Sequence, residues 1–170
     1  MTREQRTVAV GAASGVVTMV LLVWLLSSVI QPPPMGDNVG DRIGYALRWL
    51  VVAILPLVAM LATVGNSRFL SEAIDPTIGK ENQRMVVDGR VADNTLQQFV
   101  VFTVGLLALS ANLPTRSLSV IPAAAITFVI ARLVFWFGYR IHPLYRAPGF
   151  SSTFYLNAGM LLANLWLWLR

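Results

Sequence analysis

The chain has 170 residues, of which 56% are hydrophobic and 12% charged; its net charge is +5 and it contains no cysteine. This composition is typical of an integral membrane protein, and it excludes disulfides, thiolate metal sites and a cysteine nucleophile supplied by the protein. Nucleic acid is not an expected partner, because the arginines are scattered near the predicted membrane boundaries and form no basic stripe.

Five apolar stretches are long enough to cross a bilayer as helices. The first, 7–30, is longer than the apolar region of a signal peptide and ends in prolines, so we expect it to be retained as a membrane span. Turn residues follow it, and Pro56 should kink the second span. The sequence therefore predicts an all-α, polytopic protein embedded in the lipid bilayer, with its other spans at 44–64, 94–112, 117–139 and 152–169.

A long polar segment, 66–93, separates the second and third spans and is expected to be a solvated loop with a break at Asp75-Pro76 and Gly79. A helix that enters the third span can begin after Gly79. Counting basic residues on the two sides gives eight against four, and the richer side should be cytoplasmic. With five spans, the N-terminus is then predicted in the cytoplasm and the C-terminus on the opposite side.

The first group of candidate site residues is Arg90, Asn94 and Gln97, spaced i, i+4, i+7. They share a helix face if the helix reaches back to Arg90, and they offer a cation and two amides to a ligand. The alternative is structural: Asn94 and Gln97 have the spacing of a capping box, or Asp93 caps the third span.

The second group is Arg132, Tyr139, Arg140 and Arg146, with His142 between them. An ionisable residue inside a span is by default a functional candidate, and several arginines together can clamp carboxylates or a phosphate. The alternatives are that Arg132 snorkels or pairs with a neighbouring helix and that the other two arginines follow the positive-inside bias. A general-base role for His142 lacks a carboxylate nearby in sequence.

Asn157 and Asn164 lie seven residues apart on the last span and are interpreted as packing or oligomer contacts. The sequence contains no metal-ligand cluster. No acidic residue follows Asp93, and there is no inverted repeat, so a transporter is the less favoured interpretation.

Three segments taken in order carry a resemblance to a known family: RVADNTLQQF at 90–99, ARLVFWFGY at 131–139 and YRAPGF at 145–150. They resemble the MAPEG family, the membrane-associated proteins in eicosanoid and glutathione metabolism, and within it the mattrin-type branch, which has an extra N-terminal span. The resemblance implies a MAPEG-like four-helix domain over 44–170, with 1–43 as an additional N-terminal membrane helix and turn. It also implies a homotrimer that binds glutathione between subunits, near the cytoplasmic face.

The resemblance assigns roles to individual positions. Arg90 and Asn94 match residues that contact glutathione, Arg132 and Tyr139 match residues of the following span beside the ligand, and Arg146 matches the arginine proposed to stabilise the glutathione thiolate. Arg146 is therefore the candidate catalytic residue, because a nearby guanidinium favours the ionised thiol.

The sequence also departs from the family pattern. Gln97, counted among the candidate ligand-binding residues, stands where members commonly have glutamate, Phe135 where some have histidine, and Asp93 where some have arginine. The leading hypothesis is a glutathione-dependent transferase or peroxidase acting on lipophilic substrates. The alternative is a non-catalytic scaffold or accessory subunit of a membrane complex that retains the fold.

Overall fold

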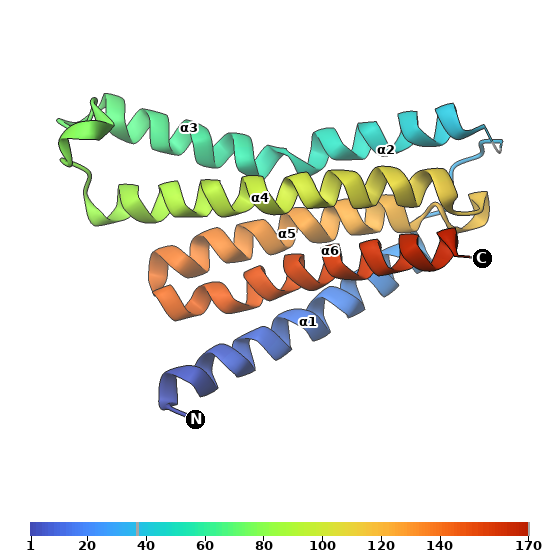
Figure 1. The fold of residues 1–170 in the computed structure, drawn as a ribbon, viewed down its shortest axis with the longest axis horizontal. Helices are drawn as coiled ribbons and strands as arrows, with labels where there is room; N and C mark the ends of the chain where they lie inside the picture. The colour runs from blue at the N-terminus through green and yellow to red at the C-terminus, as the bar shows by residue number, and fades with distance from the viewer. Residues whose placement is uncertain (37, 170) are drawn as a thin grey trace.

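In the computed structural model, which describes residues 1–36 and 38–169, the chain is a bundle of long helices lying side by side (Figure 1). No strand occurs among the described residues, and the predicted all-α fold is confirmed. Three short 3-10 turns, η1 (Pro76–Ile78), η2 (Thr115–Ser117) and η3 (Pro143–Arg146), lie between the helices. The helices are α1 (Arg3–Val29), α2 (Val39–Ala53), α3 (Leu55–Phe69), α4 (Gln83–Asn112), α5 (Val120–Ile141) and α6 (Ala147–Trp168).

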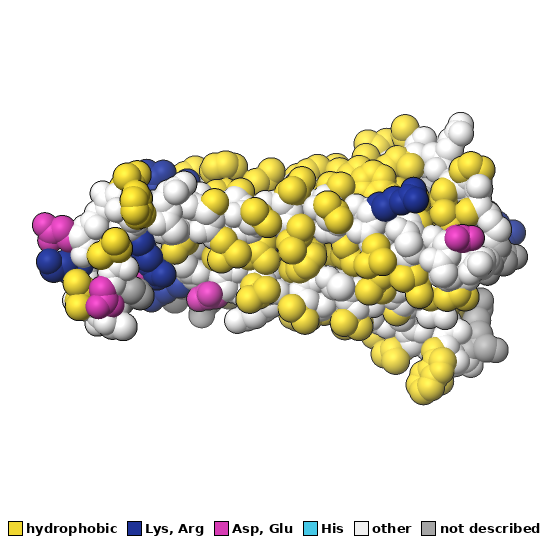
Figure 2. All heavy atoms as spheres, turned by 90° about the horizontal axis from the view of Figure 1, so that it is seen from above, with side chains coloured by type: hydrophobic (Ala, Val, Ile, Leu, Met, Phe, Trp, Pro, Cys, Tyr) yellow, Lys and Arg dark blue, Asp and Glu magenta, His cyan; other side chains and the backbone are white. Residues whose placement is uncertain are grey.

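Four helical segments of the described chain are long and apolar enough to cross a membrane: Arg3–Val29, Val39–Phe69, Gln83–Asn112 and Thr115–Ile141. α6 is not among them, although its 22 residues match the length of a span, because it carries serine, threonine and asparagine on faces that contact other helices. On the face shown in Figure 2, charged side chains gather toward the two ends and hydrophobic side chains cover the stretch between them. The protein is an integral, multi-pass membrane protein in contact with the lipid bilayer.

α2 and α3 run in one direction as a single broken span, and the successive spans of the bundle alternate in direction (Figure 1). The start of α1, the α3–α4 loop and the α5–α6 junction lie at one end of the bundle, and the α1–α2 connection, the α4–α5 connection and the end of α6 lie at the other. The basic residues of the two sets that the structure describes therefore lie toward opposite ends. The cytoplasmic assignment of the richer end stays a prediction.

α4 begins soon after Gly79, as the sequence allowed. Its N-cap is Asn82, whose side-chain oxygen accepts a hydrogen bond of 3.0 Å from the Met85 amide, and the helix continues through the polar residues to Asn112. Asn94 lies in the helix interior, so the capping alternative at Asp93 or Asn94 is wrong. A polar stretch can be helical when a good cap begins it and its exposed face meets water.

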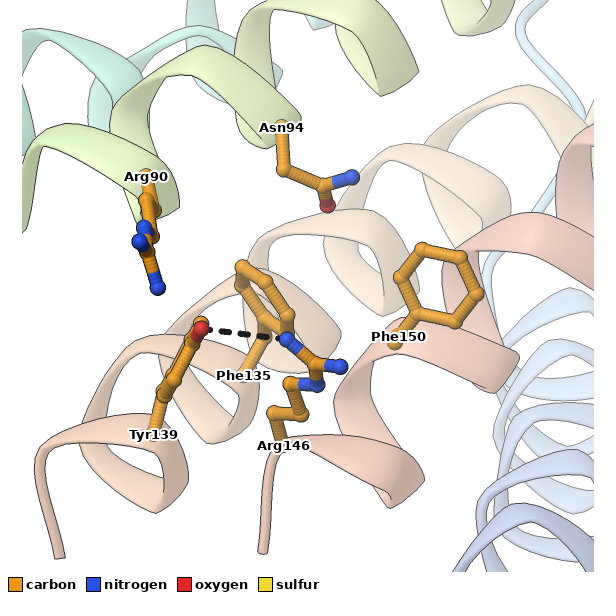
Figure 3. Close-up of a pocket in the computed structure, with 6 residues that line it drawn as sticks. All are labelled: Arg90, Asn94, Phe135, Tyr139, Arg146 and Phe150. Carbon is orange, nitrogen blue, oxygen red and sulfur yellow. Dashed lines mark hydrogen bonds between the residues drawn. The ribbon is translucent and has the colours of Figure 1, made fainter. Parts of the chain in front are cut away.

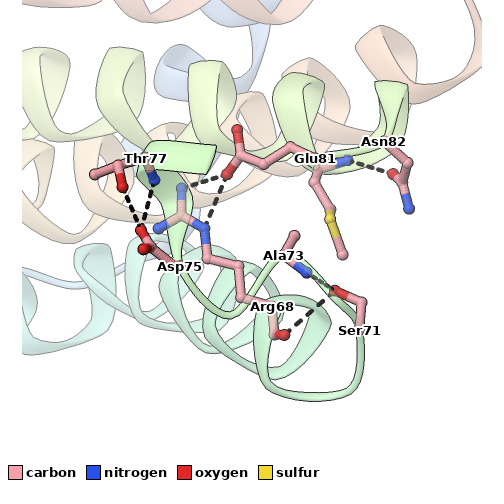
Figure 4. A network of polar contacts seen from close by, with 8 residues as sticks. Arg68, Ser71, Ala73, Asp75, Thr77, Glu81 and Asn82 are labelled. Carbon is pink, nitrogen blue, oxygen red and sulfur yellow. Dashed lines mark hydrogen bonds and ion pairs between the residues drawn. The ribbon is translucent and has the colours of Figure 1, made fainter. Parts of the chain in front are cut away.

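The remaining α3–α4 loop is short and held by side-chain contacts (Figure 4). Arg68 donates from Nε and Nη2 to Glu81 Oε1 at 2.9 and 2.6 Å. Asp75 accepts hydrogen bonds from the Thr77 hydroxyl and amide, which lower the pKa of its carboxyl, and Gly79 adopts a φ of 70°. The break predicted around these residues is confirmed, whereas most of the predicted loop is helical.

Pro56 divides the second span, as predicted. α2 ends at Ala53 and α3 begins at Leu55, with Pro56 in its first turn, where the missing proline N–H leaves no helical hydrogen bond unmade. The kink takes the form of a break at Ile54.

The N-terminal helix α1 is part of the bundle and packs on α5 and α6. Ser152 Oγ donates to the Gly15 carbonyl at 2.8 Å and Ser151 Oγ to the Ala12 carbonyl at 3.1 Å. A Cβ on Gly15 would lie only 2.2 Å from the Pro148 carbonyl oxygen. Small residues thus let the two backbones approach closely, the usual means by which membrane helices associate.

α5 lies at the centre and contacts α1, α2, α4 and α6. One buried apolar cluster joins it to α2, α4 and α6 around Phe102 and Phe128, whose ring centroids are 4.4 Å apart. A second cluster, around Met60, Val91 and Phe135, lies toward the end at which α5 finishes. The candidate site borders this second cluster.

Candidate functional site

A cavity of about 320 Å³ opens where α4, α5, η3 and α6 meet, at the end of the bundle that carries the α5–α6 junction (Figure 3). Four of the predicted site residues line it together, whereas Arg132 and Gln97 do not. Its lining residues are Arg90 and Asn94 from α4, Phe135 and Tyr139 from α5, Arg146 from η3 and Phe150 from α6.

On one side of this cavity, Arg146 and Tyr139 contact each other. Arg146 Nη1 donates to the Tyr139 hydroxyl oxygen at 3.1 Å, and the guanidinium carbon lies 5.0 Å from the centroid of the tyrosine ring (Figure 3). Tyr139 is buried, while Arg146 is exposed. One face of the guanidinium is thus held against the ring, and its remaining N–H groups are available to a ligand.

The turn before Arg146 is set by its neighbours. His142 Nδ1 accepts a hydrogen bond of 3.2 Å from the Leu144 amide, so the imidazole caps η3 and does not line the cavity. A Cβ on Gly138 would lie 2.4 Å from the Tyr145 carbonyl oxygen. Glycine at this position therefore allows η3 to pass close over α5, and it was not recognised from the sequence as part of the site.

Arg132 lies beneath the cavity and is completely buried. Its Nη1 donates to Asn94 Oδ1 at 3.0 Å, and its Nη2 donates to the Gly149 carbonyl at 3.1 Å and to the Thr153 hydroxyl. The predicted pairing with a neighbouring helix is therefore present, with α4 and with α6. Because the side-chain oxygen of Asn94 already accepts a hydrogen bond from Arg132, the side-chain amide nitrogen of Asn94 is the group left to face a ligand.

Gly149 is a second glycine that the site requires. A Cβ there would lie 2.3 Å from the Phe135 amide nitrogen and 2.5 Å from the Ala131 carbonyl oxygen. The first turn of α6 can therefore lie directly on the α5 backbone, which brings Phe150 to the rim of the cavity. In the sequence, Gly149 was noted only within the segment YRAPGF that carries the family resemblance, and nothing there indicated this contact.

Arg140 does not belong to the cavity. Its Nε and Nη2 each donate to Asp88 at 2.7 Å, and Trp136 Nε1 donates to the same carboxylate at 2.9 Å. Asp88 is buried, and this ion pair joins α4 to α5. The arginines of the second candidate group thus occupy three separate environments, and sequence reasoning had no signal for the partner of Arg140.

Gln97 is exposed on α4. It lies three residues beyond Asn94, which rotates its side chain by about 60° and moves it about 4.5 Å along the helix. Gln97 therefore shares the predicted helix face with Arg90 and Asn94 but lies outside the part of that face that lines the cavity. The packing interpretation of Asn157 and Asn164 is confirmed: they donate to the Gln98 and Gly105 carbonyls of α4, each at 3.0 Å.

The lining of the cavity is rich in hydrogen-bond donors. Arg90, Arg146 and the amide of Asn94 all donate, and no aspartate or glutamate is among the described residues that line it. The phenyl rings of Phe135 and Phe150 form apolar walls. Such a site favours a small molecule with acceptor oxygens and negative charge.

Comparison with known proteins places these residues in a family. The model of the MAPEG family matches residues 46–166. Transmembrane protein 79 of Mus musculus is 28% identical over 133 residues, 78% of this chain and 34% of that protein, and its counterpart in Bos taurus is 27% identical over the same share of this chain and 33% of its own length. The chain thus spans about a third of these curated relatives, and no solved structure matches it. With most of its length matched by the family model, the chain belongs to the MAPEG family.

Proposed function

We propose that the cavity binds glutathione or a closely related anionic small molecule. The observation that carries this proposal is that four donor-bearing residues, Arg90, Asn94, Tyr139 and Arg146, converge from three elements on one cavity with no carboxylate in its described lining. The two carboxylates of glutathione are suitable acceptors for the two guanidinium groups and the amide nitrogen.

In this proposal the ligand supplies the sulfur, because the chain has no cysteine. Arg146 lies beside the thiol and favours its ionised form, with the proton released to water. The thiolate would then attack the electrophilic carbon of a lipophilic acceptor that arrives from the bilayer, and the leaving group would depart with its bonding electrons. Arg132 would act as a positioning residue, since it holds Asn94 and does not line the cavity.

The proposal includes a homotrimer, in which the cavity lies next to a neighbouring subunit. The exposed side chain of Gln97 would then be available to a ligand held across the subunit boundary. Native mass spectrometry of the purified protein tests this part by itself: a mass of three chains supports it, and a monomer that still binds ligand removes it.

Calorimetric titration of the protein in nanodiscs with reduced glutathione tests the binding site. Saturable binding is expected, with affinity at least ten-fold lower in Arg90→Ala, which removes a charge-assisted pair with a carboxylate, and in Arg146→Ala, which removes the cation beside the thiolate. Arg116→Ala, an exposed arginine at the other end of the bundle, is the matched control and should bind as the unaltered protein does. The diethyl ester of glutathione should bind weakly. Equal binding of the ester, or no binding at millimolar glutathione, would remove the proposal.

A second candidate function is binding without turnover. It is favoured by the described lining of the cavity, which holds no carboxylate to pair with the ligand's amino group. Turnover with 1-chloro-2,4-dinitrobenzene, which releases chloride when a thiolate attacks the ring, separates the two functions. A glutathione-dependent rate abolished in Arg146→Ala supports the transferase, and saturable binding with no rate above the uncatalysed reaction supports the non-catalytic protein.

A further inference from the structure

A separate hollow of about 580 Å³ lies between the first turns of α4 and the last turns of α5. It shares no residue with the described lining of the candidate site. We call it the Arg84–Arg140 hollow, and it is lined by Gln83, Arg84, Val87, Phe137, Arg140 and Ile141. It lies where α4 begins and α5 ends, and because α5 belongs to a candidate membrane span, the end of α5 is expected near a membrane surface.

Arg140 is held in place in this hollow before any ligand arrives. Asp88 accepts from its Nε and Nη2, and its guanidinium carbon lies 4.7 Å from the Trp136 ring centroid. The Arg140 side chain is 19% exposed and that of Asp88 is 2% exposed. Both N–H groups of Nη1 and the second one of Nη2 remain for another acceptor, since a guanidinium carries five donors.

Arg84 adds a second cation to the same side of α4. It lies one turn before Asp88, a spacing that places both side chains on one helix face. Arg84 and Arg140 with Asp88 leave a net charge of +1 at the mouth of the hollow. The hollow therefore favours one negative charge with several acceptor oxygens, which is the description of a phosphodiester.

The other half of the hollow is apolar. Phe137 is 53% exposed and Ile141 is 74% exposed, and both lie with Val87 in its lining. A soluble anion would leave this apolar surface uncovered, whereas an acyl chain would cover it. Arginines at the surface level of a membrane helix, with apolar side chains beside them, match the two parts of a phospholipid.

We infer that the Arg84–Arg140 hollow is a binding site for one anionic phospholipid. Its phosphate would accept hydrogen bonds from the two arginines, and an acyl chain would lie over Phe137 and Ile141. A zwitterionic phospholipid carries a second, positive group on the same head, so it gains less from a site of net charge +1. Selection of an anionic head over a zwitterionic one is the distinguishing property of this site.

Native mass spectrometry of the full chain, released from nanodiscs of equal parts dioleoylphosphatidylglycerol and dioleoylphosphatidylcholine, tests the inference. The unaltered protein should retain the anionic lipid in at least five-fold excess, and Arg84→Gln should lower that excess about five-fold, the effect of one arginine at a membrane surface. Arg116→Gln, which removes an exposed arginine at the opposite end, should leave the excess unchanged. Equal retention of both lipids by the unaltered protein, or equal losses in the two variants, would overturn the inference.

Three further measurements separate the contribution of the arginines to lipid binding from that of the apolar side chains. The double variant Arg140→Gln/Asp88→Asn removes the ion pair without leaving a buried carboxylate unpaired and keeps the net charge at +1, so it should lower the excess less than Arg84→Gln does. Phe137→Ala should weaken retention of the anionic lipid, and millimolar glycerol phosphate should fail to displace it. Displacement by glycerol phosphate would show a free-anion site and overturn the assignment to a lipid.

Discussion

Replacing Gly15 with alanine tests the contact that joins α1 to the rest of the bundle. The added Cβ would lie 2.2 Å from the Pro148 carbonyl oxygen and 2.7 Å from Ser151 Oγ, distances at which one backbone must move. α1 should therefore shift away from α6, and the hydrogen bonds from Ser151 and Ser152 to α1 should lengthen or break.

The free-energy change can be worked from three parts. Forcing a methyl group into a packed interface costs about 1–3 kcal/mol, and the two interhelical hydrogen bonds contribute about 0.6 kcal/mol each. Both serines keep partners within α6, so no hydroxyl is left unsatisfied. Alanine favours the helical state over glycine by about 1 kcal/mol. The sum is a loss of about 1–3 kcal/mol in the free energy of unfolding.

The assay is reversible unfolding of the purified protein in mixed micelles by increasing mole fractions of dodecyl sulfate. Gly159→Ala is the matched control, because a Cβ on this α6 glycine meets nothing within 4 Å. The control should be neutral or slightly stabilised. If Gly15→Ala and Gly159→Ala unfold alike, the close approach of α1 to α6 does not contribute to stability, and the account of α1 given above is wrong.

Three further predictions concern polar contacts between helices, each checked by the same unfolding titration. Arg132→Met should lower the free energy of unfolding by about 2–4 kcal/mol, because it removes the charge-assisted hydrogen bonds that join α5 to α4 and α6; a loss below 1 kcal/mol would contradict the assigned hydrogen bonds. Trp136→Phe keeps an aromatic ring and removes one donor to Asp88, for an expected loss of about 1–2 kcal/mol, and Trp24→Phe at an exposed position of α1 is the control. Asn157→Leu should cost about 0.6–1.7 kcal/mol through its lost hydrogen bonds to α4, and no change would show that they are weak.

The fold was largely predictable because hydropathy alone separates membrane helices from the rest. The positions at which the helices begin and end were less predictable. The charged residues 83–93 were interpreted as loop or as the start of a helix, and composition alone could not decide between them. Asn82 is a good N-cap, and a helix that extends beyond the membrane can expose a polar face to water. Pro56, whose effect is local, was interpreted correctly.

The candidate site was predictable to the level of helix faces and no further. Spacing placed Arg90 and Asn94 together, and the structure brings them to one cavity with Tyr139 and Arg146. Spacing could not show that Arg132 lies below that cavity, because its depth depends on the close packing of Gly149 against α5. Nor could it pair Asp88 with Arg140, which lies 52 residues away in sequence.

The pairing of α1 with α6 has a consequence for biosynthesis. The serine hydroxyls that contact α1 lie 137 and 139 residues along the chain from their acceptors, so the ribosome makes α1 long before its partner exists. Until α6 emerges, the strip of small residues at Gly11 and Gly15 faces lipid or another newly made helix. Chains interrupted before residue 147 should therefore be prone to mispair through this strip, and quality-control machinery in the membrane would meet them in that state.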